Sequence, residues 1–337
     1  MPVVRADLKI FRSQTFNDTA TNGGRQSSPP IEVVSGVVGN VFQDAGEAER
    51  TAGSEKFQKV FFVNHETTGL KLFNATVFVE NFTPGEDDIV FFPATTERDI
   101  QSDVTGVTDF FGAGTLDSAV SAGATSIDVA VHDGSLSYFR NGMLLRISDK
   151  TDIDDTGNVE EFIRVHPTTA ITVLADVVTI PLETALLNGF GLSPETRVMG
   201  VFESGDLEPL LENLLVTSGS GTFNDTIVTF DNEGTIDQDW TITFTSATAF
   251  DVSGDEVGSV GSGTISGTFA PGNADFGGAP FFTIPVGSWG GTFATSDTVE
   301  FTTRGSQIPI WMKRLLPAGA ASLAANKAIF VMDGESA

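Results

Sequence analysis

Apolar and polar residues alternate over several short stretches of the chain, and turn-forming residues separate these stretches. Trp240, Ile242 and Phe244 occupy every second position of DWTITFT, with threonines between them. GATSIDVAV and DTVEFTT repeat the same period of two. This period places alternate side chains on opposite faces of a strand, and glycine-rich segments between such stretches mark turns. The pattern therefore predicts a mainly β chain of small sandwich or barrel units.

Helical patterns are few. DAGEAERTAG, residues 44–53, is a helix candidate, but its glycines limit it to about two turns. DLEPLLENLLV, residues 206–216, fits either a short helix or a connecting strand. We therefore expect few and short helices.

Turn-rich segments divide the predicted strands into three groups. Residues 1–112 contain KVFFVN, LKLFNATVFVENF and DDIVFFP, and we expect an α+β or β assembly domain there. Residues 113–203 hold five or six short strands, which suits a small barrel or sandwich module, either an insertion or a simple bead of the chain. Residues 204–337 are predicted to form a C-terminal β-sandwich domain.

Charge is distributed unevenly along the chain, whose formal net charge is −27. Residues 1–71 hold eight acidic and eight basic residues, whereas residues 198–303 hold fifteen acidic residues and no Lys or Arg. The last 34 residues hold four basic and two acidic residues. Nucleic-acid binding needs clustered Lys and Arg, so this acidic chain is not expected to bind nucleic acid. The near-neutral N-terminal and slightly basic C-terminal segments are the better candidates for protein contacts.

Motifs that would indicate an enzyme or a membrane protein are absent from the sequence. There is no cysteine, no phosphate-binding GxxxxGK[ST] loop, no dinucleotide fingerprint and no GxSxG. The three histidines are far apart and lack metal-ligand spacing. No apolar stretch approaches the roughly 20 residues that span a bilayer. We expect no catalysis, no cofactor and no membrane contact.

The best candidate for ion binding is SDKTDIDDTGNVEE, residues 148–161. Asp152, Asp154, Asp155 and Glu160 are hard oxygen ligands of the kind that Ca²⁺ prefers. The twelfth position from Asp152 is Ile163 and not the glutamate of an EF-hand. A solvated acidic hairpin tip is the favoured interpretation, and this Ca²⁺ site is only a weak candidate.

Aromatic residues supply the structural and interface candidates. Trp289 precedes two glycines and can anchor a sheet corner, with a sugar-stacking platform as the alternative. Phe-Phe pairs stand at 61/62, 91/92, 110/111 and 281/282. Adjacent strand residues face opposite sides, so burying both rings needs a second layer or a neighbouring subunit. The candidates are Trp289, Trp311, Phe62, Phe92, Phe111 and Phe282.

Several runs of the chain are similar to known sequences. PFFTIP, WGGT, VEFTT, PIW and PAG, from Pro280 onward, resemble the C-terminal part of virion structural proteins of tailed bacteriophages and prophages. FNDTATNGG, EAERTAGSEKFQKVFF and TPGEDDIVFFP resemble the same family, and GATSIDV, FRNGMLLRIS and EEFIRV resemble a β module of such proteins. The resemblance touches all three groups and includes no catalytic residues.

The resemblance implies a non-enzymatic structural protein of the tail or baseplate. Such a protein would be made in the host cytoplasm, form homo-oligomers and contact other virion proteins. Head decoration is an alternative within the same class. A carbohydrate-binding or host-recognition module, with Trp289 or Trp311 as stacking platforms, and a virion-associated hydrolase are the rivals from other classes.

Overall fold

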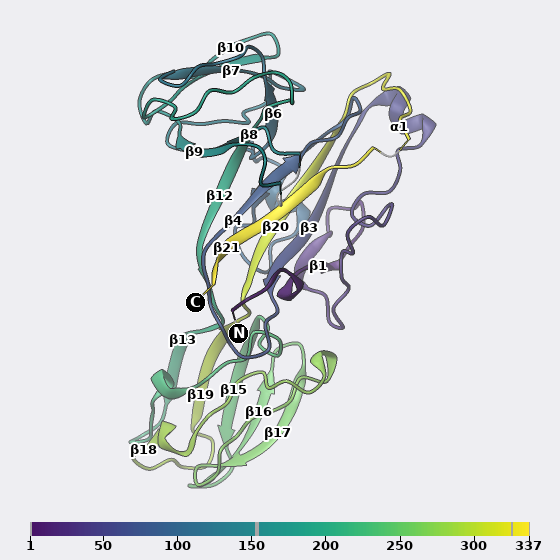
Figure 1. The fold of residues 1–337 in the computed structure, drawn as a ribbon. Coiled ribbons are helices and arrows are strands. Elements are labelled where there is room, and N and C mark those ends of the chain that lie inside the picture. The colour runs from purple at the N-terminus through teal and green to yellow at the C-terminus, as the bar shows by residue number, and fades with distance from the viewer. Residues whose placement is uncertain (1, 152–154, 325, 337) are drawn as a thin grey trace.

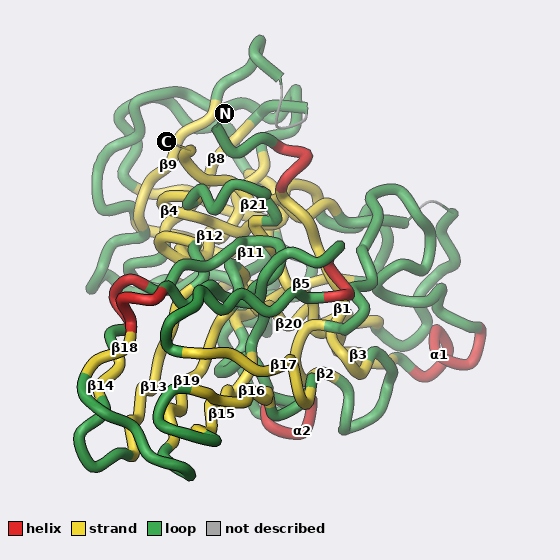
Figure 2. Tube along the Cα trace, turned by 90° about the horizontal axis from the view of Figure 1, so that it is seen from below, coloured by secondary structure: helices red, strands yellow, loops and turns green. Residues whose placement is uncertain are grey.

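The structure is a computed structural model that describes residues 2–151, 155–324 and 326–336. It has three β units, which follow one another along the long direction of the molecule (Figure 1). In that described part the α-helices are α1, Glu47–Ala52, and α2, Gln101–Val104, and the view from below shows them as short pieces among strands and loops (Figure 2). The predicted mainly β class, with small β units and few short helices, is confirmed.

The central unit contains an antiparallel sheet that combines both ends of the sequence. Its strand order is β2-β1-β3-β20-β5. The bounds are β1 Leu8–Thr15, β2 Gly23–Gln26, β3 Ser54–Asn64, β5 Asp88–Pro93 and β20 Gln307–Leu316. In the β3–β20 register Lys59 lies opposite Trp311, which in turn lies opposite Phe92 of β5.

A second, larger sheet joins the central unit to the middle unit. Its strand order is β10-β11-β7-β6-β12-β4-β21, and β8, which pairs with β9, also pairs with β12. The bounds are β4 Leu72–Asn81, β6 Ala113–Leu116, β7 Ser126–Ala130, β8 Leu144–Ser148, β9 Glu160–Arg164, β10 Thr172–Leu174, β11 Val177–Pro181, β12 Arg197–Leu207 and β21 Ile329–Ser336. β12 is the shared strand: its first half pairs with β6 and β8, and its second half pairs with β4.

The third unit has a sheet of its own. The strand order is β13-β19-β15-β16-β17, and β14 pairs with β18 beside it. The bounds are β13 Leu210–Thr217, β14 Thr222–Phe223, β15 Gln238–Phe244, β16 Ala249–Gly254, β17 Gly258–Thr264, β18 Trp289–Gly290 and β19 Thr298–Arg304. Trp240, Ile242 and Phe244 are buried on its inner face, as their alternation predicts.

Two hydrophobic cores follow this division. One cluster of buried side chains is continuous across the central and middle units, from Phe62 and Phe78 to Leu145 and Ile180. The third unit has a separate cluster that includes Trp240 and is rich in phenylalanine. The middle unit therefore shares its core with the central unit, and the third unit does not.

Strand pairing corrects the predicted C-terminal domain of residues 204–337. β20 pairs with β3 and β5, and β21 pairs with β4, so both strands belong to the central unit. The third unit is thus inserted between β12 and β20, and 206–216 contributes strand and not helix. The local pattern of QIPIWMKRLL indicates a buried strand but carries no information about its partner strand.

Candidate functional site at the junction of the central and third units

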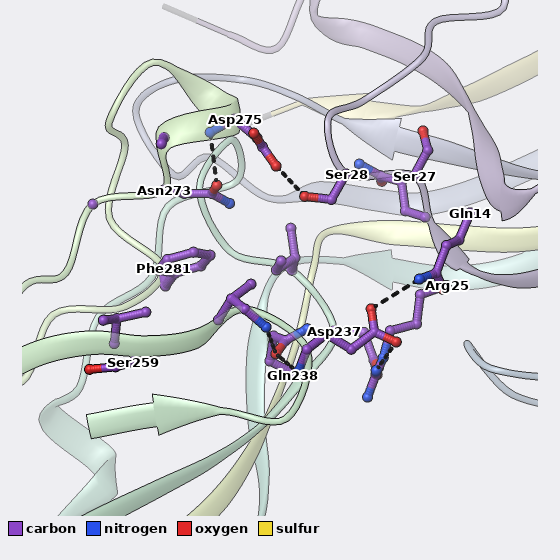
Figure 3. Close-up of a pocket in the computed structure, with 17 residues that line it drawn as sticks. Gln14, Arg25, Ser27, Ser28, Asp237, Gln238, Ser259, Asn273, Asp275 and Phe281 are labelled. Carbon is purple, nitrogen blue, oxygen red and sulfur yellow. Dashed lines mark hydrogen bonds and ion pairs between the residues drawn. The ribbon is translucent and has the colours of Figure 1, made fainter. Parts of the chain in front are cut away.

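A polar groove lies where β2 of the central unit faces the start of β17 in the third unit (Figure 3). It has a volume of about 720 Å³. Its lining is mostly polar and includes Gln14, Arg25, Ser28, Glu256, Asp275 and Phe281. Side chains that are more than 200 residues apart in sequence therefore meet in one groove.

Arg25, on β2, is the main cation of this groove and is 7% exposed. Its guanidinium contacts three carboxylates of the third unit, at distances of 2.5 to 2.6 Å: Asp237, Asp255 and Glu256. A buried guanidinium needs such partners, because desolvating an unpaired charge is costly. Around Arg25, carboxylates therefore outnumber cations.

Arg98 provides a second cation from the loop that connects β5 to α2. Its Nε donates to Asp237 Oδ1 at 2.7 Å, and its two terminal nitrogens bind the Asp239 carboxylate at 2.5 and 2.9 Å. The hydrogen bonds to Asp239, opposed by burial and reinforced by Asp237, raise the pKa of Arg98 above its ordinary value. Asp237 is thus shared by two arginines of the central unit, which supply the cations that pair with the junction carboxylates of the third unit.

Lys59, on β3, is the next cation of the central unit near these carboxylates, and its side chain is completely buried. Its Nζ donates to Asp99 Oδ1 at 2.6 Å. It also donates to backbone carbonyl oxygens at 2.8 to 3.3 Å, those of Thr96, Glu97 and Asp99. Burial is the largest influence on the pKa of Lys59 and lowers it, although Asp99 acts in the opposite direction.

Hydrogen bonds to both oxygens hold the Asp99 carboxylate in place. Its Oδ2 accepts from the Thr95 backbone N–H at 2.8 Å, and its Oδ1 accepts from Trp311 Nε1 at 3.3 Å. Gly23, with φ of +111°, passes directly over this cluster: a Cβ there would lie 2.7 Å from the Trp311 ring and 2.8 Å from the Asp99 carbonyl oxygen. Any side chain at this position would clash, so the first glycine of TNGG, Gly23, is required.

Glu97 is buried next to Lys59 and Asp99, and the three residues form a buried charged cluster. Its Oε2 accepts from Gln307 Nε2 at 2.9 Å, and the residue is 6% exposed. Burial, and then the neighbouring Asp237 carboxylate, raise the pKa of Glu97 to about 7. Glu97 can therefore hold or release a proton near neutral pH.

The Ca²⁺ candidates do not converge on a site in the described part of the chain. Asp152 and Asp154 lie outside the described residues. Asp155 accepts hydrogen bonds within its own turn, from Thr151, Gly157 and Asn158. Glu160 is paired with Lys150 and Arg146. Across residues 2–151, 155–324 and 326–336, no three His, Asp or Glu residues are grouped so that they could hold a metal ion.

The aromatic candidates lie in the cores. Trp311, Phe62, Phe92 and Phe111 are buried in the core of the central and middle units, and Phe282 is buried in that of the third unit. Both rings of every Phe-Phe pair are buried, and the chain itself covers both faces.

Trp289 is only partly buried. Four phenylalanine rings surround it at centroid distances of 4.9 to 5.8 Å: Phe223, Phe244, Phe250 and Phe293. The turn after it requires Gly291, because a Cβ there would lie 1.9 Å from the Ser220 carbonyl oxygen.

The charged residues of the junction were not among the site residues predicted from the sequence. Lys59 carried one signal, because it directly precedes the apolar run VFFV of a predicted strand. Arg98 and Asp99 gave no signal in ERD, since their partners lie far away in sequence. Only the tertiary structure joins these residues.

Comparisons with family models, with curated proteins and with solved structures found no match for this chain. Within the described residues, no helix has the length and apolar character needed to cross a membrane.

Proposed function

We propose that this chain is a non-enzymatic structural component of a tailed-phage virion, located in the tail or baseplate, that works by self-association and by contacts with other virion proteins. The sequence resemblance supplies the virion context. The observation that carries the proposal is an ordered apolar loop on the central unit.

This loop, residues 27–46, connects β2 to α1. Four of its aliphatic side chains are at least half exposed: Ile31, Val34, Val37 and Val38. Backbone hydrogen bonds hold it on β1, from Arg12 N to Ile31 O at 2.9 Å and from Val33 N to Ile10 O at 2.7 Å. Clustered exposed apolar side chains on a fixed backbone are typical of protein–protein contact sites.

The distribution of charge supports contacts through the same unit. Strand pairing brings the near-neutral residues 1–71 together with the slightly basic C-terminal segment in the central unit. The third unit, by contrast, falls almost entirely within residues 198–303, which hold fifteen acidic and no basic residues, and Arg304 at the end of β19 is its one Lys or Arg. Two copies meeting through their central units avoid the repulsion that two third units would generate.

The sugar-binding alternative has less support. Stacking on a sugar needs an accessible ring face. Trp311 is completely buried, and the Trp289 ring is surrounded by phenylalanines. The carboxylates of the groove are likewise occupied, because Asp237 and Glu256 contact Arg25, and Asp275 accepts a hydrogen bond from Ser28 Oγ.

Sedimentation velocity of the full chain over a range of concentrations tests self-association. We expect the native chain to form oligomers and the double variant Val37→Asp, Val38→Asp to remain monomeric, because a buried unpaired carboxylate opposes association. Leu174→Asp is the matched control: Leu174 is 84% exposed but lies on the middle unit, so this variant should associate like the native chain.

A native chain that remains monomeric at every concentration would contradict the proposed self-association. The virion location is tested separately, by labelling purified particles of the encoding phage with antibodies against the chain. Label on the tail or baseplate supports the proposal. Unlabelled particles, or selective binding of the chain to a glycan array without particle label, would overturn it.

A further inference from the structure

We propose that Lys59 and Asp99 condense into an intramolecular amide, which joins β3 covalently to the loop of residues 94–100. The inference rests on the contacts of this buried pair and is independent of the virion proposal. It assigns a modification site to a chain that has no cysteine for disulfides.

The two reacting groups are held against each other. Lys59 Nζ lies 2.6 Å from Asp99 Oδ1, and the two side chains are 0% and 5% exposed. Three backbone carbonyls fix the amine, and the Thr95 N–H fixes the second carboxyl oxygen. Two groups held in contact react as if at very high concentration, with effective molarities of about 10⁵ M or more in favourable cases.

Two aromatic rings lie beside the pair, in addition to the polar groups that hold it. The Phe61 and Trp311 ring centroids lie 5.2 and 5.9 Å from Lys59 Nζ. Burial lowers the pKa of Lys59 and so favours its neutral amine, which is the form that can react. A desolvated lysine amine is a competent nucleophile, and a site that excludes water opposes hydrolysis of the product.

The reaction balances without an oxidant or a cofactor. A proton moves from the Lys59 ammonium to the Asp99 carboxylate. The Nζ lone pair then attacks Cγ, so that an N–C bond forms. One C–O bond breaks, and the hydroxyl leaves as water with a second proton from Nζ. The product is a neutral amide and one water molecule.

Glu97 is the buried carboxyl next to this pair in the chain. Its backbone carbonyl accepts from Lys59 Nζ at 2.8 Å, whereas its carboxyl accepts from Gln307. The charged groups that act on this carboxyl are Asp237, Lys59 and Arg304. A buried carboxyl that interacts with the amine can act as a general acid–base, and Glu97→Gln tests whether it moves that second proton.

The amide would strengthen the junction. Asp99 follows Arg98, whose guanidinium binds Asp237 and Asp239 of the third unit. A covalent bond from β3 to Asp99 therefore anchors the loop that holds the third unit. The product can keep the hydrogen bond from Thr95 N–H to the amide oxygen.

The intact mass of the full chain, measured under denaturing conditions, tests the proposal. We expect the mass to be lower than the sequence mass by one water molecule, and fragmentation to place a branched peptide at Lys59 and Asp99. A chain with its full sequence mass would overturn the proposal and leave a non-covalent ion pair.

Four variants separate the amide from other dehydrations. Lys59→Arg cannot form the amide and should regain the full mass, whereas a persistent water loss would indicate a cyclic imide and overturn the proposal. Asp99→Asn should lose ammonia and converge on the same product mass as the native chain. Glu97→Gln should slow the reaction at least tenfold. Lys56→Arg, on the same strand, is the control that should react like the native chain.

Discussion

The middle and third units are attached to the central unit in different ways. The middle unit shares the strand β12 and a continuous hydrophobic core with it. The third unit has its own sheet and core. Its contacts with the central unit include the ion pairs of Arg25 and Arg98, hydrogen bonds such as that from Asn232 Nδ2 to the Leu70 carbonyl at 2.8 Å, and the packing of the Phe276 ring against Phe11 and His65. A shared core makes folding cooperative, whereas a polar interface between separate cores resembles a contact between two proteins.

Ion pairs with buried members occur at both attachments, but the two attachments differ in which unit supplies the cations. At the middle unit, Arg146 and Arg197 contact Glu80 within the shared sheet. At the third unit, the arginines that pair with the junction carboxylates, Arg25 and Arg98, come from the central unit. We infer that removing a cation from the junction with the third unit separates two units that stay folded. Deleting part of the middle unit, in contrast, unfolds the middle and central units together.

Deletion gives the largest expected difference. Replacing residues 117–196 with a short linker should abolish cooperative unfolding, because it removes β7 to β11 and opens the shared core. Replacing residues 209–304 in the same way should leave a cooperative thermal transition of the remaining units. Thermal melts followed by circular dichroism compare the two. A cooperative melt of the first deletion would contradict the shared core.

Truncation of one aromatic side chain should affect one core only. Trp240→Ala should destabilise the third unit by about 3–5 kcal/mol, the usual cost of removing a buried aromatic ring. Phe62→Ala is the counterpart for the other core. Calorimetry of the full chain should show that each variant lowers a different transition, and equal shifts of both transitions by either variant would show that the cores are coupled.

Loss of the junction arginine should have a smaller effect. Arg25→Gln leaves Glu256 without its cation and Asp255 with only a 3.9 Å contact to Arg98. We expect it to weaken the attachment by roughly 1–3 kcal/mol while both core transitions persist. The matched control is Arg164→Gln, which breaks the exposed pair with Glu203 and should change stability by less than about 1 kcal/mol. Faster proteolysis between the units measures the attachment, and identical cleavage of both variants would count against it.

The smallest expected effect is a dependence on pH. The pKa of Glu97 is raised from 4.5 to about 7 in the folded chain, so the folded state binds more protons between these values. Its contribution is complete below the unfolded pKa and is lost as the pH rises through 7. Stability should therefore fall by roughly 1–2 kcal/mol from about pH 6 to about pH 8, and Glu97→Gln should flatten this slope. Denaturant titrations at several pH values measure it; an equally steep slope in the variant would assign it to another group.

The class of the fold could be predicted from the sequence because the alternation of apolar and polar residues is a local property of each strand. DWTITFT and DTVEFTT became the adjacent strands β15 and β19. The C-terminal boundary was wrong because apolar continuity in PIW shows burial but not pairing. The junction could not be predicted, since Arg98 and Asp237 are 139 residues apart and each looks like an ordinary surface charge. Lys59 was likewise hidden, because its burial depends on a loop that folds over β3.

Native-state hydrogen exchange of the full chain tests the central claim most directly, namely that the third unit is a separate folding unit and the middle unit is not. Amide hydrogens in β15 and β16 should share one opening free energy. Those in β4, β8 and β12 should share another, because their strands belong to one sheet and one core. If β8 instead opens apart from β4 and β12, or if β15 opens together with them, the account is contradicted.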